Sequence, residues 1–244
     1  MAARGWRAAA VVLVLACARG PGGEAPAPAA AQDPVPTRQL GLTAFAGQAI
    51  PVLPLTLVAP DPALADDSVY ADWRDRTTAL RTADTIIGEA LMERGPEVQW
   101  ILPPELRKIA RRSPGMVGDP DQLGQAVMRN PKLERLPDNF RQNIRGLVAV
   151  AGNRYVLIPA ALGFTRAPAA PSASSAPAAP STSSAAAVPA VPAVPVRADL
   201  SLVLADVRNG VVLWRSAASG TGDTPRAALR AAMAAVLPLA MGGS

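Results

Sequence analysis

Two strands and the turn that joins them are encoded between Asp199 and Gly220, in the stretch DLSLVLADVRNGVVLWRSAASG. Leucines at every second position of its first half, from Leu200 to Leu204, have the period of a strand with one buried face. Asn209 and Gly210 tolerate positive φ and therefore mark a tight turn. The stretch predicts a β-hairpin.

Two registers satisfy this pattern. A two-residue turn pairs Ala205 with Trp214 and places the indole on the face opposite the leucines. A type I turn that ends in a bulge at Gly210 instead pairs Leu204 with Trp214. This second register gathers one apolar face, made of Leu200, Leu202, Leu204, Val212, Trp214 and Ala218. Because a slip of one residue moves every side chain to the other face, we predict the bulged turn. The opposite face is also apolar, which predicts partial cover on both sides of the hairpin; its residues are Val203, Ala205, Val207 and Leu213.

The first residues of the chain look like an export signal. Arg4 and Arg7 precede an apolar run that is too short to cross a bilayer as a helix. The run ends in Val14-Leu15-Ala16-Cys17, which resembles the bacterial lipobox, although that family most often has Leu where Val14 stands. The resemblance implies a lipoprotein signal peptide at 1–16, cleavage before Cys17, and acylation of this cysteine with a diacylglycerol and an amide-linked chain such as palmitate. Several acyl chains anchor a protein stably, whereas one binds only marginally.

Cys17 is the single cysteine of the chain, so no intramolecular disulfide is expected. The alternative is an unlipidated cysteine within a signal peptide that is cleaved a few residues later. Ala18, rather than Asp, follows the cysteine. By resemblance to proteobacterial sorting rules, this favours the periplasmic face of the outer membrane.

Composition and charge argue against several classes of partner and site. The 24 Lys and Arg residues exceed the 19 Asp and Glu residues, for a formal charge of +5. The arginines are dispersed and no aromatic side chains interleave with them, so a nucleic-acid partner is not expected. The chain has no histidine, which excludes Ser-His-Asp, Cys-His and His-metal sites. No Gly-rich phosphate loop is present, and no cofactor is predicted.

Composition also divides the chain. Residues 17–38 are rich in Gly, Pro and Ala and predict a lipidated, flexible tether. Residues 39–241 predict a single α/β domain. Within it, residues 167–198 are almost entirely Ala, Pro, Ser and Val, which predicts a disordered insertion that contributes nothing to the core. Because strands flank this tract on both sides, we interpret it as a long hairpin loop, which costs little entropy to extend.

The order of elements predicts the fold class. The predicted strands are 49–58, 98–102, 154–164 and the two strands of the hairpin. The predicted helices are 77–94, 104–112, 139–151 and one that starts after Thr224. Pro51 and Pro54 remove two ladder donors, which predicts an irregular or edge strand. The order β-α-β-α-α-β-β-β-α predicts an α/β (α+β) fold, with a mixed sheet of about five strands packed with three to four helices.

This order resembles a fold group of bacterial envelope lipoproteins. The group comprises curli-secretion lipoproteins, lipoprotein activators of penicillin-binding proteins, and the amino-terminal domain of the Tol-system β-propeller protein. The local resemblance is Asp206-x-x-Asn209-Gly210 followed by Val212-Leu213-Trp214. The prolines of the first strand and the region 113–137 depart from the group. The resemblance implies a non-enzymatic protein that acts through protein contacts.

Charged and aromatic residues are the remaining candidates for sites. The acidic pairs are expected to be caps and loop residues: Asp66/Asp67, Asp72/Asp75 and Asp119/Asp121. Trp73, Trp100 and Trp214 are expected in or beside the core rather than in a ligand cleft. The densest basic run is expected on a solvated helix face, and contact with an anionic lipid or glycan surface is the sharper hypothesis; its residues are Arg107, Lys108, Arg111 and Arg112.

We therefore predict a non-enzymatic envelope lipoprotein. Its membrane anchor would be Cys17, and its partner an envelope protein or peptidoglycan. The alternative is an envelope enzyme that uses carboxylates, Ser or Thr without histidine or metal. Converging carboxylates in a deep pocket would favour that alternative.

Overall fold

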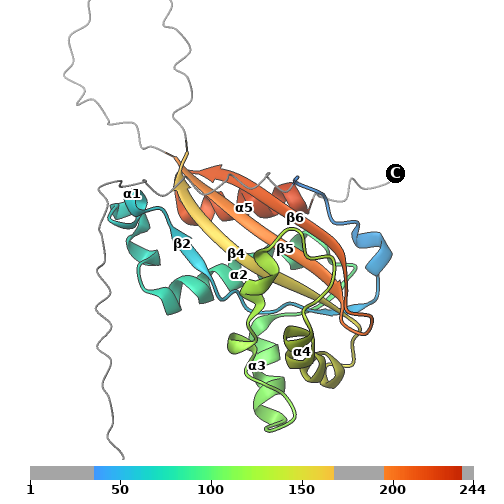
Figure 1. Ribbon diagram of the computed structural model, residues 1–244. Coiled ribbons are helices and arrows are strands. Elements are labelled where there is room, and N and C mark those ends of the chain that lie inside the picture. Colours follow the sequence, from blue (N-terminus) through green and yellow to red (C-terminus); the bar gives the residue numbers. More distant parts are fainter. Residues whose placement is uncertain (1–35, 168–194, 238–244) are drawn as a thin grey trace, which may run out of the picture. The chain divides into compact units, whose positions relative to one another are not determined.

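The computed structural model describes residues 36–167 and 195–237. Within this part of the chain, six strands form a mixed arrangement with helices on both faces (Figure 1). The predicted α+β class is therefore confirmed. The signal peptide, Cys17 and most of the predicted tether lie outside the described residues, as do 168–194 of the Ala/Pro/Ser tract and the end of the predicted domain from 238 onward.

The elements have the following bounds. The strands are β1 (Ala49–Pro51), β2 (Val58–Pro60), β3 (Gln99–Ile101), β4 (Tyr155–Arg166), β5 (Val196–Asp206) and β6 (Val211–Gly222). The α-helices are α1 (Pro62–Ala65), α2 (Arg76–Arg94), α3 (Pro103–Arg112), α4 (Asp138–Val150) and α5 (Pro225–Val236). The 3-10 helices are η1 (Leu42–Phe45), η2 (Ser68–Trp73), η3 (Pro120–Gln122) and η4 (Gln125–Arg129).

The strands form two hydrogen-bonded sheets that touch. β4, β5 and β6 make an antiparallel meander, and β2 lies parallel to β4 on its other side. β1 pairs in parallel with β3. Beyond β1, the Val52 N–H donates to the Ile101 carbonyl of β3 at 2.9 Å, and the Leu53 N–H donates to the Leu157 carbonyl of β4 at 2.9 Å. These two bonds join the small sheet to the large one.

The prediction of one strand over 49–58 is wrong. The segment gives β1 at its start and β2 at its end, and the two belong to different sheets. Pro51 and Pro54 lack the N–H that a continuous ladder requires. The Pro54 carbonyl accepts instead from the buried Gln125 side chain, with Nε2 to O at 2.6 Å. The predicted irregularity is present, and it divides the strand.

Two hydrophobic clusters cover opposite faces of the sheet. The first packs α2 and α5 against the sheet through residues such as Ile86, Leu202 and Met233. The second packs α3, α4 and η4 against it through residues such as Leu106, Ile144 and Val203. Strand β5 serves both because its leucines face one cluster, while Val203 and Ala205 face the other. The predicted cover on both sides is confirmed for these residues, and Trp73 and Trp100 lie in the first cluster.

The predicted register of the hairpin is confirmed in its main part. Leu204 pairs with Trp214, and Gly210 has a φ of +69°. The ladder shifts after Leu204, so that Ala205 pairs with Val212 and Leu213 is the extra residue. A bulge reverses the facing of the residues beyond it. Val212 therefore packs with the second cluster instead of the leucines, and Leu213 is 47% exposed; both placements were predicted wrongly.

The structure also differs from the prediction at both ends of the tract 167–198. Strand β4 extends to Arg166 and β5 begins at Val196. The Ala167 N–H donates to the Pro195 carbonyl at 2.8 Å, and Val196 and Ala198 are fully buried. The first and last residues of the tract thus belong to the core, because they continue the two strands that it connects.

An extended segment before the predicted domain boundary already contacts the edge of the sheet. The Thr37 hydroxyl donates to the Ala217 carbonyl at 2.8 Å, and the Arg38 N–H donates to the buried Ser216 hydroxyl at 2.9 Å. The Leu40 N–H donates to the Val236 carbonyl of α5 at 3.0 Å. Among the described residues, Thr37 and Arg38, which the sequence placed in the tether, thus already contact the domain.

Candidate functional site

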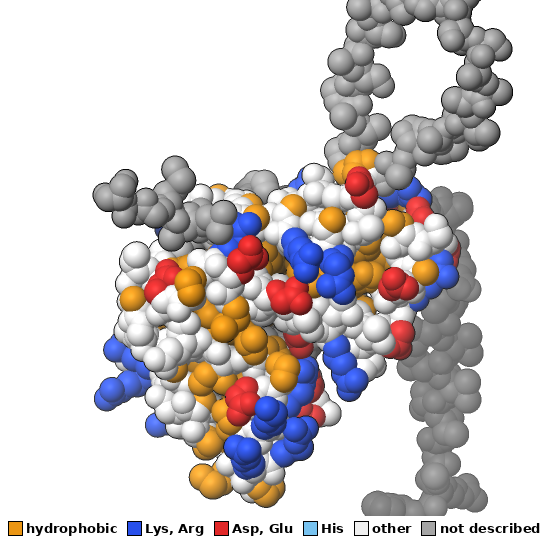
Figure 2. Space-filling view, turned by 180° about the vertical axis from the view of Figure 1, so that it is seen from behind, with side chains coloured by type: hydrophobic (Ala, Val, Ile, Leu, Met, Phe, Trp, Pro, Cys, Tyr) orange, Lys and Arg blue, Asp and Glu red, His pale blue; other side chains and the backbone are white. Residues whose placement is uncertain are grey.

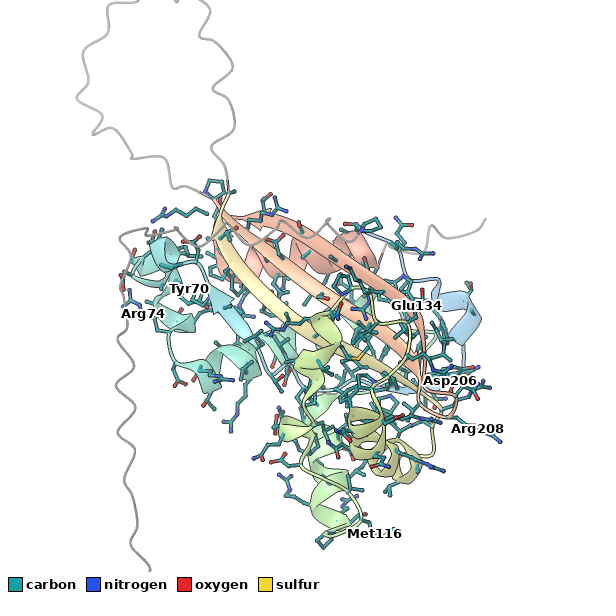
Figure 3. The ribbon with its side chains drawn as sticks, in the orientation of Figure 1. Tyr70, Arg74, Met116, Glu134, Asp206 and Arg208 are labelled. Atoms are coloured by element: carbon teal, nitrogen blue, oxygen red, sulfur yellow. The ribbon has the colours of Figure 1, made fainter. Side chains whose placement is uncertain are left out.

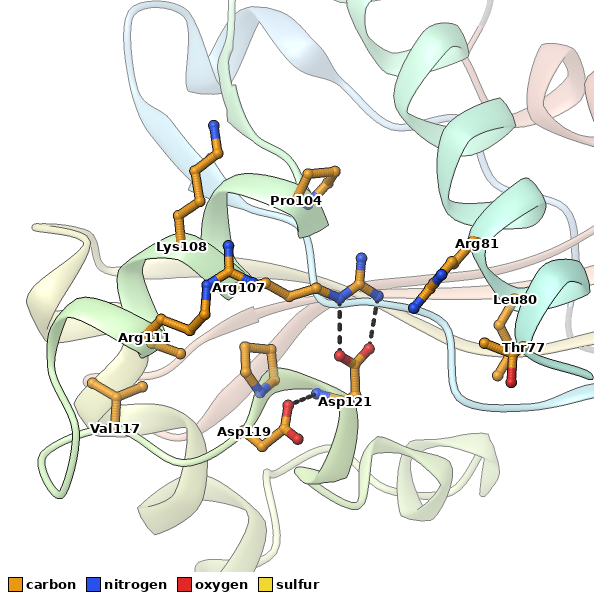
Figure 4. A pocket seen from close by; sticks show the side chains of 12 residues that line it. Thr77, Leu80, Arg81, Pro104, Arg107, Lys108, Arg111, Val117, Asp119 and Asp121 are labelled. Carbon is orange, nitrogen blue, oxygen red and sulfur yellow. Dashed lines mark hydrogen bonds and ion pairs between the residues drawn. The ribbon is translucent and has the colours of Figure 1, made fainter.

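A cleft of about 850 Å³ lies between α2, α3 and the loop that leads to η3 (Figure 4). Residues of α2 form one wall, and residues of α3 and of 117–121 form the other. Its lining comprises Thr77, Leu80, Arg81, Pro104, Arg107, Lys108, Ala110, Arg111, Val117, Asp119, Pro120 and Asp121. The cleft therefore contains three members of the predicted basic run.

Arg107 is at the centre of an ion-pair network in this cleft. Its Nε and Nη2 donate to the two carboxylate oxygens of Asp121 at 2.9 and 2.7 Å (Figure 4). Nη2 also donates to Oδ2 of Asp84 at 3.0 Å. Two-pronged contacts between guanidinium and carboxylate are the strong form of this interaction. Asp121, together with Asp84, raises the pKa of Arg107 above its ordinary value.

Asp84 is the buried member of the network. It belongs to α2 and is 5% exposed, and its Oδ1 accepts from the Leu55 N–H at 2.7 Å. Burial raises the pKa of Asp84 to about 6, against the hydrogen bonds from Leu55 and Arg107. Sequence reasoning missed this residue. The available signal was an acidic side chain one residue after Ala83, at the margin of the apolar stripe of its helix.

In each of the three predicted acidic pairs, one carboxylate caps the start of a helix, as expected. Asp67 accepts from the Val69 N–H, Asp75 from the Thr78 N–H, and Asp119 from the Asp121 N–H. The hydrogen bond from Val69 lowers the pKa of Asp67, and those from Thr78 lower the pKa of Asp75. Asp121 differs from this prediction, because its carboxylate is committed to Arg107.

The four residues of the predicted basic run have different surroundings in the structure. Arg107 is bonded to carboxylates, and Lys108 pairs with Glu105 at 3.0 Å. Arg111 is exposed, lines the cleft and forms no ion pair within the described part of the chain. Arg112 is also exposed but does not line the cleft. Arg81 of α2, which the sequence did not nominate, faces the cleft from the opposite wall (Figure 4).

A second hollow of about 520 Å³ adjoins the first and shares Arg81, Pro104 and Arg107 with it. Asp84, Thr85 and Glu89 also line it, but most of its exposed surface is apolar and comes from residues such as Leu102 and the 54% exposed Met92. A Cβ on Gly88 would lie 3.1 Å from Cδ1 of Leu102, so the glycine lets α2 and Leu102 approach closely. From behind, Figure 2 shows basic side chains beside hydrophobic surface on the lower part of the molecule.

The hairpin motif behind the family resemblance is structural. Asp206 lies at the hairpin turn (Figure 3) and is 2% exposed. Its carboxylate accepts from Arg154 and from the backbone and side chain of Asn209. Burial opposes ionisation of Asp206, but the hydrogen bonds from Arg154 and Asn209 outweigh it and lower the pKa. This arrangement fixes the turn and leaves the carboxylate no open position.

Metal clusters and membrane spans are both absent from the described residues. Within 36–167 and 195–237, no group of three or more Cys, Asp or Glu side chains is placed to hold a metal ion. In the same ranges no helix has the length and hydrophobicity needed to cross a membrane.

None of the known protein families matches this chain, and no curated protein sequence matches it. Among solved structures, the LpoB C-terminal domain from Salmonella enterica matches with 15% sequence identity and a TM-score of 0.35. The match covers 72% of this chain and 83% of that chain. Agreement at this level does not relate the functions of the two proteins.

Proposed function

We propose that this protein is a lipoprotein of the bacterial envelope, anchored through Cys17 on the periplasmic face of the outer membrane, and that it acts by binding another envelope component. In this proposal the cleft between α2 and α3 is the binding site. The protein has no catalytic role of its own.

One observation carries the choice of binding over catalysis. Each carboxylate at the cleft is already engaged in hydrogen bonds, since Asp84 and Asp121 hold Arg107 and Asp119 caps η3. A general acid or base must reach the substrate with a proton that can move. Asp84 has the raised pKa expected of such a group, but its two oxygens are bonded and its side chain is buried. Among the cationic side chains that line the cleft, Arg81 and Arg111 form no ion pair with any residue that the structure describes, so their guanidinium groups are open to a ligand.

The anchor is tested by a Cys17→Ser substitution in cells supplied with a palmitate analogue. We expect the wild-type chain to be labelled and to sediment with outer membranes in a density gradient. The variant should lose the label and leave the membrane fraction. A variant that is still labelled and membrane-bound would exclude lipidation at Cys17, and wild-type label in the inner-membrane fraction would reverse the localisation.

The binding role is tested by placing a photo-crosslinking amino acid at Thr77, on the cleft, and at Arg226, an exposed position on α5. We expect a discrete adduct with one envelope component from position 77 and none from position 226. Equal adducts from both positions, or none from either, would contradict the cleft as the contact site.

A further inference from the structure

The geometry points to an acidic polypeptide segment with large apolar side chains as the occupant of the cleft. We propose that a partner protein inserts such a segment along α2, from the cationic cleft into the apolar hollow beside it. This inference rests on the proposed binding role and specifies the chemistry of the partner.

The length and form of the site favour a single chain. The two hollows share Arg81, Pro104 and Arg107, so they lie side by side along α2. On α2 their lining runs from Thr77 to Met92, which is about 22 Å at the rise of an α-helix. An extended segment of about seven residues covers that distance. A bilayer contacts a protruding surface, whereas a concave channel between two helices accommodates one chain.

The apolar lining of the two hollows selects for apolar side chains. Leu80, Leu102 and Val117 are only partly buried and line the two hollows. Met92, at the far end, is 54% exposed. Burial of such surface is the main favourable term in association, and a flexible methionine adapts to varied partners.

The charges of the channel select for acidic residues. The carboxylates that line the two hollows each have a partner: Asp84 and Asp121 bond Arg107, Asp119 caps η3, and Glu89 pairs with Arg230 at 2.9 Å. Arg81 and Arg111 form no ion pair within the ranges that the structure describes. They stand on opposite walls, so a carboxylate of the incoming segment would meet a guanidinium on either side (Figure 4).

The experiment selects peptides on the full chain, solubilised in a non-ionic detergent. A random display library of peptides of about twelve residues, enough to fill the channel, is the probe. Peptides that bind the double variant Arg81→Glu, Arg111→Glu are removed from the pool. We expect the retained peptides to carry Asp or Glu beside Leu, Phe or Met. A synthetic copy of the most enriched peptide then gives affinities by fluorescence anisotropy.

Three variants locate the binding. Arg81→Glu and Arg111→Glu should each lower the affinity for the synthetic peptide about fivefold. Met92→Glu, at the apolar end of the site, should lower it by a similar factor. Arg226→Glu makes the same charge change on exposed surface of α5 and should leave the affinity unchanged. All four positions are exposed, so the variants are expected to fold, and circular dichroism checks this. Equal losses from Arg81→Glu and Arg226→Glu would overturn the proposal.

The control probes separate the competing occupants. A copy of the peptide with Lys in place of its acidic residues should not bind, and binding of that copy would overturn the acidic specificity. If vesicles of phosphatidylglycerol bind the chain through Arg81 and Arg111 while no acidic peptide is enriched, the site is a membrane contact and the inference is wrong. Neither result depends on Cys17 or on crosslinking in cells, so failure here is distinct from failure of the proposed function.

Discussion

Asp84 of α2 and Arg107 of α3 form an ion pair of 3.0 Å that links helices packed on opposite faces of the sheet. The second carboxylate oxygen of Asp84 holds the Leu55 N–H, in the segment where the first strand is broken. One buried side chain therefore connects both helical layers to the irregular segment between β1 and β2. Arg107, which lines the cleft, is held in place by this connection.

The pH dependence of stability should reveal Asp84. In the unfolded chain this carboxyl titrates near its ordinary value of 3.8, whereas burial raises its pKa to about 6 in the folded protein. Between these pH values the folded state holds the proton more tightly, so stability falls as pH rises. We expect urea unfolding to show a decrease of about 2 to 3 kcal/mol from pH 4 to pH 6.5.

The matched variant for this prediction is Asp84→Asn, which should lack most of that decrease. Carboxyls with lowered pKa values, such as Asp67, Asp75 and Asp206, act in the opposite sense. They support the fold above pH 4, and their contribution is lost only as pH falls through their folded pKa values. The two effects occupy different pH windows. An unchanged slope in the Asn variant would assign the decrease to another group.

Removal of the Arg107 guanidinium should destabilise the protein, because it leaves the buried Asp84 carboxylate without its cation. We expect Arg107→Leu to lower the free energy of unfolding by about 2 to 4 kcal/mol at pH 7. The loss should shrink at pH 5, where Asp84 is protonated. Lys108→Leu, one residue away and paired only with Glu105 at the surface, should cost less than about 1 kcal/mol. Equal losses from the two variants would show that the network is not structural.

Much of the fold could be predicted from the sequence because the decisive patterns are local. Helix α2 begins at Arg76 and ends at Arg94, one residue from the predicted start and at the predicted end, since Asp75 caps it and Gly95 follows it. The pairing of Leu204 with Trp214 followed from keeping the leucines on one buried face. The bulge at Leu213 did not follow, because the second cluster draws Val212 to the other face and no local signal marks this.

The cleft was less accessible to sequence reasoning. Arg107 was nominated as a surface cation, but its partners Asp84 and Asp121 lie 23 and 14 residues away and meet it only through tertiary packing. Arg81 was not nominated, because the α2 wall faces α3 only in the folded chain. The division of the first strand also depended on tertiary structure: the prolines predicted an irregular or edge strand, but not two strands that pair with different neighbours.

Gly220 should be the least replaceable glycine of the sheet. A Cβ there would lie 2.1 Å from the Ala232 nitrogen and 2.4 Å from the Ala228 carbonyl oxygen, both in the backbone of α5. Because a helix backbone cannot rotate away, α5 must shift, and we expect Gly220→Ala to cost about 3 kcal/mol and lower Tm by about 10 °C. Gly163 of β4 is the control, since its nearest such contact is 3.8 Å. A Gly163→Ala loss as large as that of Gly220→Ala would contradict the packing argument.

Gly210 tests the hairpin turn through its backbone conformation. Gly210 has a φ of +69°, where a β-branched side chain is strained. Gly210→Val should therefore lower the free energy of unfolding, measured in urea, by about 1 to 2 kcal/mol. Nearby atoms of Arg141, at 3.1 Å from the added Cβ, belong to a long side chain that is able to move. Gly210→Asn should cost clearly less, because Asn tolerates this region. Equal costs for Val and Asn would assign the effect to crowding against Arg141.

The Ala/Pro/Ser tract connects two strands whose ends are already joined. The Ala167 N–H donates to the Pro195 carbonyl, and Val196 is fully buried, so the described ends of β4 and β5 are paired with each other. Replacing 168–194 with a four-residue turn should therefore keep the fold and, through a smaller closure entropy, stabilise it by up to about 2 kcal/mol. The measurement is Tm by circular dichroism, with an unchanged or slightly raised value expected.

A second deletion that also removes Ala167 and 195–198 is the control, and it should destabilise the protein because it cuts into the buried ladder. If the first deletion also prevents folding, the tract has a structural role. If the fold survives but the crosslink from position 77 disappears, the tract recruits the partner, because the cleft itself is unchanged.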